Sequence, residues 1–250
     1  MANNKSDQPR VLCIIPARGG SKGLSKKNIR LLRGRPLIAW PVRAAQLSGA
    51  VDDVLVSTDT EDIAAEAREA GADVPFLRPA ELAQDLTTTE ASLQQALSAY
   101  EEHKGISYDI CVFLTATDIF RHPKWITEAV DVLRENPDIE SAFSVHTTTK
   151  NYWHQNAEGE WERILPWMQE YSSRQIRQKI FREDTGMACA SRAQLWRAGR
   201  RIGDKVHLIE NSVFETGIDI HSEFDLYLAE KAIEYFLEHE PERAAVFVTE

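Results

Sequence analysis

The sequence predicts an α/β protein with a doubly wound, mostly parallel β-sheet. Two short apolar runs, Val11–Pro16 and Asp109–Leu114, are typical of strands that are buried on both faces of a sheet. Segments with apolar residues at helical spacing alternate with further runs of this kind. Such alternation favours right-handed crossovers that return each strand to one parallel sheet.

The first half of the chain continues this alternation. Val54–Ser57 predicts a second strand, and Gly71 marks the end of an alanine-rich helical segment. Thr87 and Glu90 have the spacing of a capping box, which indicates that a helix begins directly after them. The helices expected in this half begin at Pro36 and cover Glu61–Ala70 and Ala91–Glu102.

The pattern is interrupted between residues 150 and 182, where Trp, Tyr, Arg and Gln are frequent and no clean period is present. We interpret this stretch as an inserted arm that covers the site or contacts a second subunit. We expect a flexible N-terminus at residues 1–9 and a single domain over residues 10–250. The other elements expected in the second half are a helix from Pro123 to about Arg134, strands at Ser141–Val145, Met187–Ala190 and Val206–Leu208, helices at Gln194–Ala198 and Ser222–Leu237, and an edge strand at Val246–Val248.

Composition excludes several classes of function. The net charge of −10 argues against an extended nucleic-acid-binding face, because phosphate backbones require clustered Lys and Arg. Cys13, Cys111 and Cys189 lie among apolar neighbours without metal-site spacing, which predicts buried free thiols in a reducing compartment. The sequence shows neither a signal peptide nor a membrane-spanning apolar run, so we expect a cytoplasmic protein.

The most informative segment is the loop that follows the first strand, residues 16–28 (PARGGSKGLSKKN). It leaves the carboxyl end of a parallel strand, which is where open α/β sheets bind ligands. Its three glycines allow the backbone N–H groups to surround an anion, although the pattern is neither a Walker A motif nor GxGxxG. The side chains that it offers to a triphosphate are Arg18, Ser21, Lys22, Lys27 and Asn28.

This loop resembles the signature of the acylneuraminate cytidylyltransferases, and three later segments are similar to the same family in the same order. They are residues 54–74 (VLVSTDTEDIAAEAREAGADV), 77–85 (LRPAELAQD) and 218–230 (IDIHSEFDLYLAE). The resemblance implies a nucleotide-diphospho-sugar transferase-like fold, with the arm as a dimerisation arm. It also implies a homodimer that transfers CMP from CTP to the anomeric hydroxyl of a sialic acid-like nonulosonic acid, releasing pyrophosphate.

The resemblance assigns roles to the phosphate-binding loop. Lys27 is expected to neutralise charge on the reacting phosphate, and Lys22 is expected to act with Arg18 on the departing pyrophosphate. The positions that hold the CTP phosphates and ribose in this family match Arg18, Ser21, Lys27 and Asn28.

Other positions match the parts of the family's site that bind the base and the acceptor. Arg78 matches an arginine near the cytosine, and Thr89 falls where a small hydroxyl residue meets the base. Arg174 and Gln175 match an Arg-Gln pair near the acid-sugar pocket, although an arginine in a dimer interface would fit this position nearly as well.

Two departures from the family pattern affect these expectations. Thr115 stands where the family has a glutamine that reads the base. The last strand ends Asp219-Ile220-His221, whereas the family usually has two carboxylates that bind Mg²⁺, for which imidazole is a poor ligand. Asp219 and His221 still share one face of a strand. Either Asp219 holds the metal alone, or the missing second carboxylate is replaced by Asp118, at the end of the fourth strand, or by His221.

A third departure concerns the acceptor. Residues 181–186 read FREDTG, whereas the family usually has FRPNG, and the two added acids can change which sugar is accepted. The alternatives to a nonulosonic acid are therefore Kdo or another acidic acceptor. A family member that binds nucleotides without catalysis is the remaining alternative.

Overall fold

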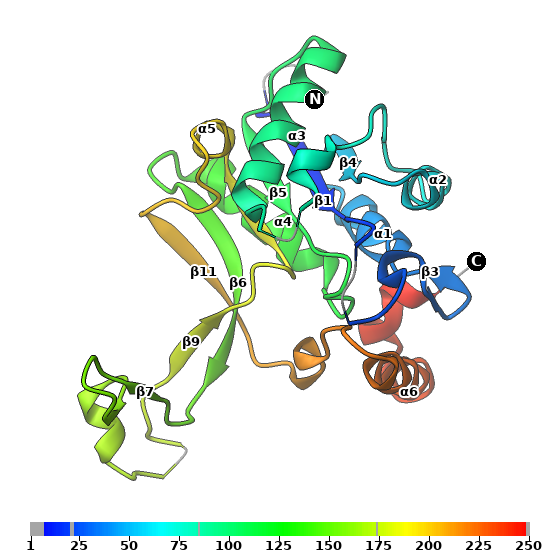
Figure 1. Cartoon of the computed structure of the whole chain (residues 1–250). Coiled ribbons are helices and arrows are strands. Elements are labelled where there is room, and N and C mark those ends of the chain that lie inside the picture. The colour runs from blue at the N-terminus through cyan, green and yellow to red at the C-terminus, as the bar shows by residue number, and fades with distance from the viewer. Residues whose placement is uncertain (1–7, 21–22, 85, 174, 249–250) are drawn as a thin grey trace, which may run out of the picture.

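A seven-stranded β-sheet forms the centre of the protein (Figure 1). Six strands follow the order β4-β1-β5-β10-β6-β11, and β9 pairs with β6 outside this path. The strands are β1 (Val11–Pro16), β4 (Asp53–Ser57), β5 (Ile110–Phe113), β6 (Ser141–Thr148), β9 (Ile180–Glu183), β10 (Cys189–Arg192) and β11 (Val206–Asn211). The computed structural model describes residues 8–20, 23–84, 86–173 and 175–248.

Five of the seven strands point in one direction. β1 is parallel to β4 on one side and to β5 on the other. β10 is antiparallel to both β5 and β6, so β6 regains the direction of β5, and β11 is parallel to β6. β9 is antiparallel to β6. The expectation of an α/β fold with a mostly parallel sheet is therefore confirmed.

Helices cover both faces of the sheet, and the alternation of side chains along β1 divides the core between them. Val11, Cys13 and Ile15 pack into a cluster with α1, α4 and α6, whereas Leu12 and Ile14 pack into a second cluster with α3 and α5. The helices are α1 (Ala39–Ser48), α2 (Glu61–Glu69), α3 (Thr89–Lys104), α4 (Pro123–Glu135), α5 (Ala193–Arg197) and α6 (Glu223–His239). The side chains of Val11–Ile15 point alternately to the two faces of the sheet, and all five are buried. Because both faces are covered, the sequence of β1 is an unbroken apolar run.

The arm extends from the sheet at the far end of β6 and β9 (Figure 1). It contains a hairpin of β7 (Trp153–Gln155) and β8 (Trp161–Arg163), which turns through Gly159 at φ +82°. The guanidinium of Arg163 lies 4.2 Å from the centre of the Trp153 ring. Strands of three residues are too short to produce a recognisable period, which is why the sequence showed none.

Three predicted details are wrong. The helix expected to begin at Pro36 begins at Ala39, because Arg35–Pro36 forms a short strand, β3. The N-cap of α3 is Thr88 rather than Thr87, and its hydroxyl accepts a hydrogen bond from the amide of Ala91 at 3.2 Å. Residues 246–248 do not form an edge strand, because Pro241–Phe247 is a 3₁₀ helix that places the Phe247 ring 5.0 Å from that of Trp40. A short apolar run cannot by itself separate a strand from a helical turn that docks against the core.

Several remaining elements are short. The other paired strands are β2 (Leu31–Leu32) and β3 (Arg35–Pro36), and the remaining 3₁₀ helices are Lys27–Ile29, Ala80–Leu82, Pro166–Gln169 and Phe214–Gly217. The predicted capping pair of α6 is present, with Ser222 and Asp225 each bonded to the other's backbone amide.

The three cysteines are free and buried as expected. Within the described ranges, no helix has the length and apolarity needed to cross a bilayer.

Candidate active site

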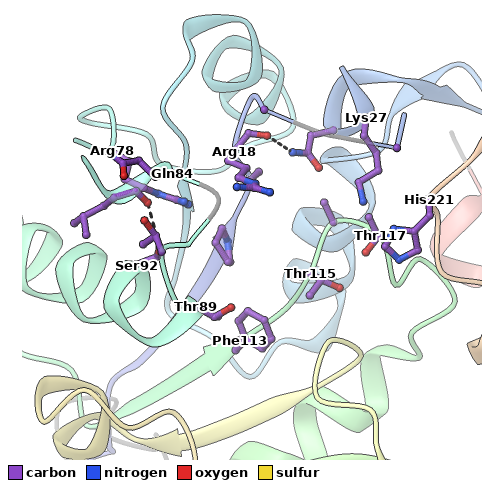
Figure 2. Close-up of a pocket in the computed structure, with 18 residues that line it drawn as sticks. Arg18, Lys27, Arg78, Gln84, Thr89, Ser92, Phe113, Thr115, Thr117 and His221 are labelled. Atoms are coloured by element: carbon purple, nitrogen blue, oxygen red, sulfur yellow. Dashed lines mark hydrogen bonds between the residues drawn. The ribbon is translucent and has the colours of Figure 1, made fainter. Parts of the chain in front are cut away.

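A cavity of about 540 Å³ opens at the carboxyl ends of β1 and β5 (Figure 2). The chain leaves β1 for β4 on one side of it and later forms β5 on the other side, so these two strands mark the point where the strand order reverses. Ligands of open α/β sheets bind in the crevice that this reversal creates. The cavity is lined by Pro16, Ala17, Arg18, Gly20, Gly23, Lys27, Asn28, Arg78, Leu82, Gln84, Thr87, Thr89, Ser92, Phe113, Thr115, Ala116, Thr117 and His221.

The described part of the loop after β1 makes hydrogen bonds both to residues outside it and within itself. The backbone amide of Gly19 donates to the Asp59 carboxylate at 2.8 Å, and the side-chain amide of Asn28 donates to the carbonyl of Arg18 at 2.9 Å (Figure 2). A Cβ at Gly23 would lie 2.7 Å from the backbone oxygen of His221, so only glycine permits this contact. Gly23 thus packs directly against the segment that carries Asp219 and His221.

Arg18 and Lys27 line the cavity from this loop (Figure 2). Burial lowers the pKa of Lys27, while the carboxylates of Asp219 and Asp118 act in the opposite direction. Two cationic side chains therefore face a common space beside two carboxylates. Ser21 and Lys22, which the sequence also assigned to the phosphates, lie outside the described residues.

The opposite side of the cavity is the α3 wall, which we define as Arg78, Leu82, Gln84, Thr87, Thr89 and Ser92. The buried guanidinium of Arg78 donates from Nε to the Ser57 hydroxyl at 3.0 Å and from Nη2 to the Ser57 carbonyl at 2.5 Å. Burial lowers the pKa of Arg78, and Asp59 opposes this effect. Arg78 and Thr89, far from the first loop in sequence, thus reach the same cavity as Arg18 and Lys27.

The loop after β5 uses its polar groups within the protein. The Thr115 hydroxyl donates to the carboxylate of Asp118, and the amide of Asp118 donates back to the Thr115 oxygen at 3.3 Å. A Cβ at Gly186 would lie 1.8 Å from the Asp118 carboxylate, so Gly186 is what allows this close packing. Burial raises the pKa of Asp118. Thr115 lines the cavity, but its hydroxyl proton is already donated to Asp118.

Arg121 is a buried residue of this region that sequence reasoning missed. Its Nε donates to the Met187 carbonyl at 3.0 Å, and its Nη2 donates to the carbonyls of Thr115 and Gly186 at 2.7 and 2.6 Å. Burial lowers the pKa of Arg121 to about 10, against the opposing charge of Asp118. Arg121 therefore joins the β5 loop to the start of β10, and nothing local in the sequence distinguishes it from a surface arginine.

The candidate metal ligands lie at the edge of the cavity. Nε2 of His221 lies 2.7 Å from Oδ2 of Asp219, while Oδ1 of Asp219 is buried and has no hydrogen-bond partner. Such an orphaned carboxylate oxygen suits a hard cation. Within the described ranges, however, no three His, Cys, Asp or Glu side chains gather as a metal-binding group. A cation at Asp219 would need further oxygens from substrate phosphates or water, as Mg²⁺ commonly uses.

Gln175, one of the two residues expected at the acceptor, is not brought to this cavity. Gln175 is exposed on the arm and is absent from the described cavity lining, and Arg174 lies outside the described residues. The lining residues that sequence reasoning missed include Gln84, Ser92, Phe113 and Thr117. Phe113 ends β5 and Thr117 follows it closely, so the rule that ligands bind at carboxyl strand ends was a signal for both.

A cytidylyltransferase family model matches residues 12–243, which is most of the chain. This protein belongs to the cytidylyltransferase family. The resemblance to acylneuraminate cytidylyltransferases is thereby confirmed at the level of the family. A cytidylyltransferase fold accounts for a nucleotide-sized cavity at the end of β1.

Two relatives show which branch of the cytidylyltransferases this chain is similar to. It is 40% identical over 123 residues to CMP-N,N′-diacetyllegionaminic acid synthase of Legionella pneumophila, which is 49% of this chain and 53% of the relative. It is 37% identical over 141 residues to N-acylneuraminate cytidylyltransferase of Escherichia coli, which is 56% of this chain and 32% of the relative. The matches thus span about half or less of these relatives' lengths.

A solved structure supports the fold. The structure of CMP:2-keto-3-deoxy-manno-octonic acid synthetase complexed with CTP has a TM-score of 0.63 to this chain, at 16% sequence identity. The superposition covers 90% of this chain and 99% of that one. At this identity the likeness concerns the fold, so the cytidylyltransferase assignment rests on the sequence match and on the cavity.

Proposed function

We propose that this protein transfers CMP from CTP to the anomeric hydroxyl of a nonulosonic sugar acid and releases pyrophosphate. The observation that carries the proposal is the cavity at the β1 and β5 ends, where Arg18 and Lys27 lie opposite the α3 wall. Its volume suits a nucleotide, and its polar groups converge from separate elements. The named activities of the two similar relatives support the acid-sugar acceptor.

The two sides of the cavity fit different parts of CTP. Arg18 and Lys27 provide positive charge for the triphosphate, with Asn28 beside them. Arg78 and Thr89 lie on the α3 wall, which we assign to the cytosine and ribose. Ser21 and Lys22, on the same loop as Arg18, remain predicted phosphate ligands.

The proposed reaction is an in-line displacement at the α-phosphorus. The acceptor's anomeric oxygen forms a bond to that phosphorus, the bond to the bridging oxygen breaks, pyrophosphate leaves, and the hydroxyl proton passes to solvent. The protein needs to position the reactants and to neutralise developing charge, which Lys27 does at the reacting phosphate and Arg18 at the leaving group.

We assign a divalent cation, Mg²⁺, to the edge of the cavity at Asp219. The unpartnered Oδ1 of Asp219 is the principal ligand, His221 flanks it, and Asp118 adds negative charge nearby. A bound cation there would supply Lewis-acid polarisation of the α-phosphate. Lys27 shares this electrostatic environment, so its ammonium is held beside the position assigned to that phosphate.

We further propose that the protein acts as a cytoplasmic homodimer through the arm. The arm exposes large apolar side chains, and exposed patches of this kind mark interaction surfaces. In such a dimer, Arg174 and Gln175 of the partner arm would contact the acid-sugar acceptor. Free buried thiols suit a reducing compartment. The exposed side chains of the arm include Trp153, Trp161, Tyr171, Ile176 and Phe181.

Pyrophosphate release tests the proposal. The protein is incubated with CTP, Mg²⁺ and separate acceptors: N-acetylneuraminic, legionaminic and pseudaminic acids, Kdo, and a neutral hexose as the control. We expect release with at least one nonulosonic acid, none with the hexose, and none after chelation of the cation. CTP binding without pyrophosphate release for any acceptor would indicate a non-catalytic family member. Release with Kdo alone would show that the acceptor is Kdo and not a nonulosonic acid.

A further inference from the structure

Most polar side chains that line the cavity are already engaged by the protein. The Thr115 hydroxyl donates to Asp118, and the Asn28 amide donates to the carbonyl of Arg18. Arg78 uses Nε and Nη2 on Ser57. These groups shape the cavity, but they already make hydrogen bonds within the protein. Few side chains of the lining therefore remain that can both donate a hydrogen bond to a base and accept one from it.

Within the described residues, two polar side chains of the α3 wall make no side-chain hydrogen bond, Thr89 and Gln84, and of these Gln84 carries separate donor and acceptor groups. Its exposed side chain lines the cavity (Figure 2), and within the described part of the chain no hydrogen bond engages its carboxamide. Asn28 is the other carboxamide in the described lining, and its amide nitrogen is used. Gln84 therefore offers one free donor group and one free acceptor on a single planar unit.

The backbone that carries Gln84 is fixed. The amide of Thr87 donates to the Gln84 carbonyl at 3.1 Å, and the Ser92 hydroxyl donates to the Leu82 carbonyl at 3.5 Å. The amide of Arg78 donates to the Thr58 carbonyl at 2.6 Å, which anchors the start of the same segment to the end of β4. A side chain on such a fixed turn can bind a ligand at a lower entropic cost than one on an unbonded loop.

We propose that Gln84 reads the Watson–Crick edge of the nucleotide base and, together with Arg78, makes the cavity prefer cytosine to uracil. This inference rests on the proposed function, because it requires a pyrimidine nucleotide on the α3 wall. Cytosine presents its amine as a donor beside the N3 and O2 acceptors, whereas uracil presents an oxygen and an N3–H donor. Arg78 can only donate, so it suits the acceptors of cytosine and opposes the N3–H of uracil. The carbonyl of Gln84 then accepts from the cytosine amine.

The experiment compares CTP and UTP affinities by isothermal titration calorimetry in the presence of Mg²⁺. The variant Gln84→Met keeps the length of the side chain and removes both polar groups. We expect it to weaken CTP binding roughly tenfold and UTP binding by less, because Arg78 opposes the N3–H of uracil, so that the CTP-to-UTP affinity ratio falls. Gln84→Glu, which can accept but cannot donate to the uracil oxygen, should keep a ratio at least as large as that of the unmodified protein.

Glu81→Met is the matched control, because Glu81 lies on the same turn and does not belong to the described cavity lining. Its affinity ratio should equal that of the unmodified protein. If Gln84→Met binds CTP and retains the full ratio, the inference is wrong while the proposed function stands. If the folded, unmodified protein binds neither nucleotide, the proposed function fails, and the role of Gln84 fails with it.

Discussion

The loops after β1 and β5 leave adjacent parallel strands at the same end of the sheet, yet they use their polar residues in opposite ways. The β1 loop is held by groups outside it, such as Asp59, and presents Arg18 and Lys27 to the cavity. The β5 loop bonds to itself and to the β9–β10 connection through Thr115, Asp118 and Arg121. In the proposed function, the β1 loop binds the ligand and the β5 loop forms the wall behind it.

This difference shows why position at a strand end is an incomplete guide to function. Both loops satisfy the rule that ligands bind at carboxyl ends of parallel strands. Whether a polar side chain there is available depends on the partners that the rest of the fold supplies. Thr115 and Lys27 both line the cavity, but the Thr115 hydroxyl is already paired with Asp118.

The largest expected effect comes from removing a charge of the β1 loop. Lys27→Ala should lower kcat/KM by about 100- to 1000-fold, because the transition state loses one of the cations that neutralise its developing charge. Pyrophosphate release measures this effect, and circular dichroism and urea unfolding check the fold. Lys26→Ala is the matched control, since Lys26 is exposed, pairs with Asp62 at 3.6 Å and is not part of the described lining. Equal activity of the two variants would contradict the role of Lys27.

The sequence carried enough information for the β1 loop and for most of the sheet. Buried strands such as Val11–Pro16 are recognised by their unbroken apolar runs. The glycine-rich basic loop that follows this strand is also a local pattern, so the sequence alone identifies it. The sequence did not show that the Thr115 hydroxyl is bonded to Asp118. That bond depends on the close packing of Gly186, some 70 residues away, against Asp118. It also could not show the hairpin of the arm, whose strands are too short to carry a period.

The next effect concerns the β5 loop and should appear in stability. Arg121→Met removes hydrogen bonds to the carbonyls of Thr115, Gly186 and Met187, of which the Gly186 oxygen keeps a second bond, from the amide of Thr115 at 3.1 Å. We expect the free energy of unfolding to fall by about 2–4 kcal/mol, measured by urea denaturation. Arg33→Met, at an exposed position, should change it by less than about 0.5 kcal/mol.

The smallest expected effect on nucleotide binding is that of Thr115→Val. Valine keeps the shape of the side chain and removes the hydroxyl, which already donates to Asp118. If the hydroxyl serves the wall and not the base, CTP affinity should stay within about twofold, while stability falls by about 1 kcal/mol as the Asp118 carboxylate loses a donor. Calorimetry with CTP and urea unfolding measure the two quantities on one sample. A tenfold loss of CTP affinity at unchanged stability would place the β5 loop among the groups that bind the ligand, and the contrast between the two loops would disappear.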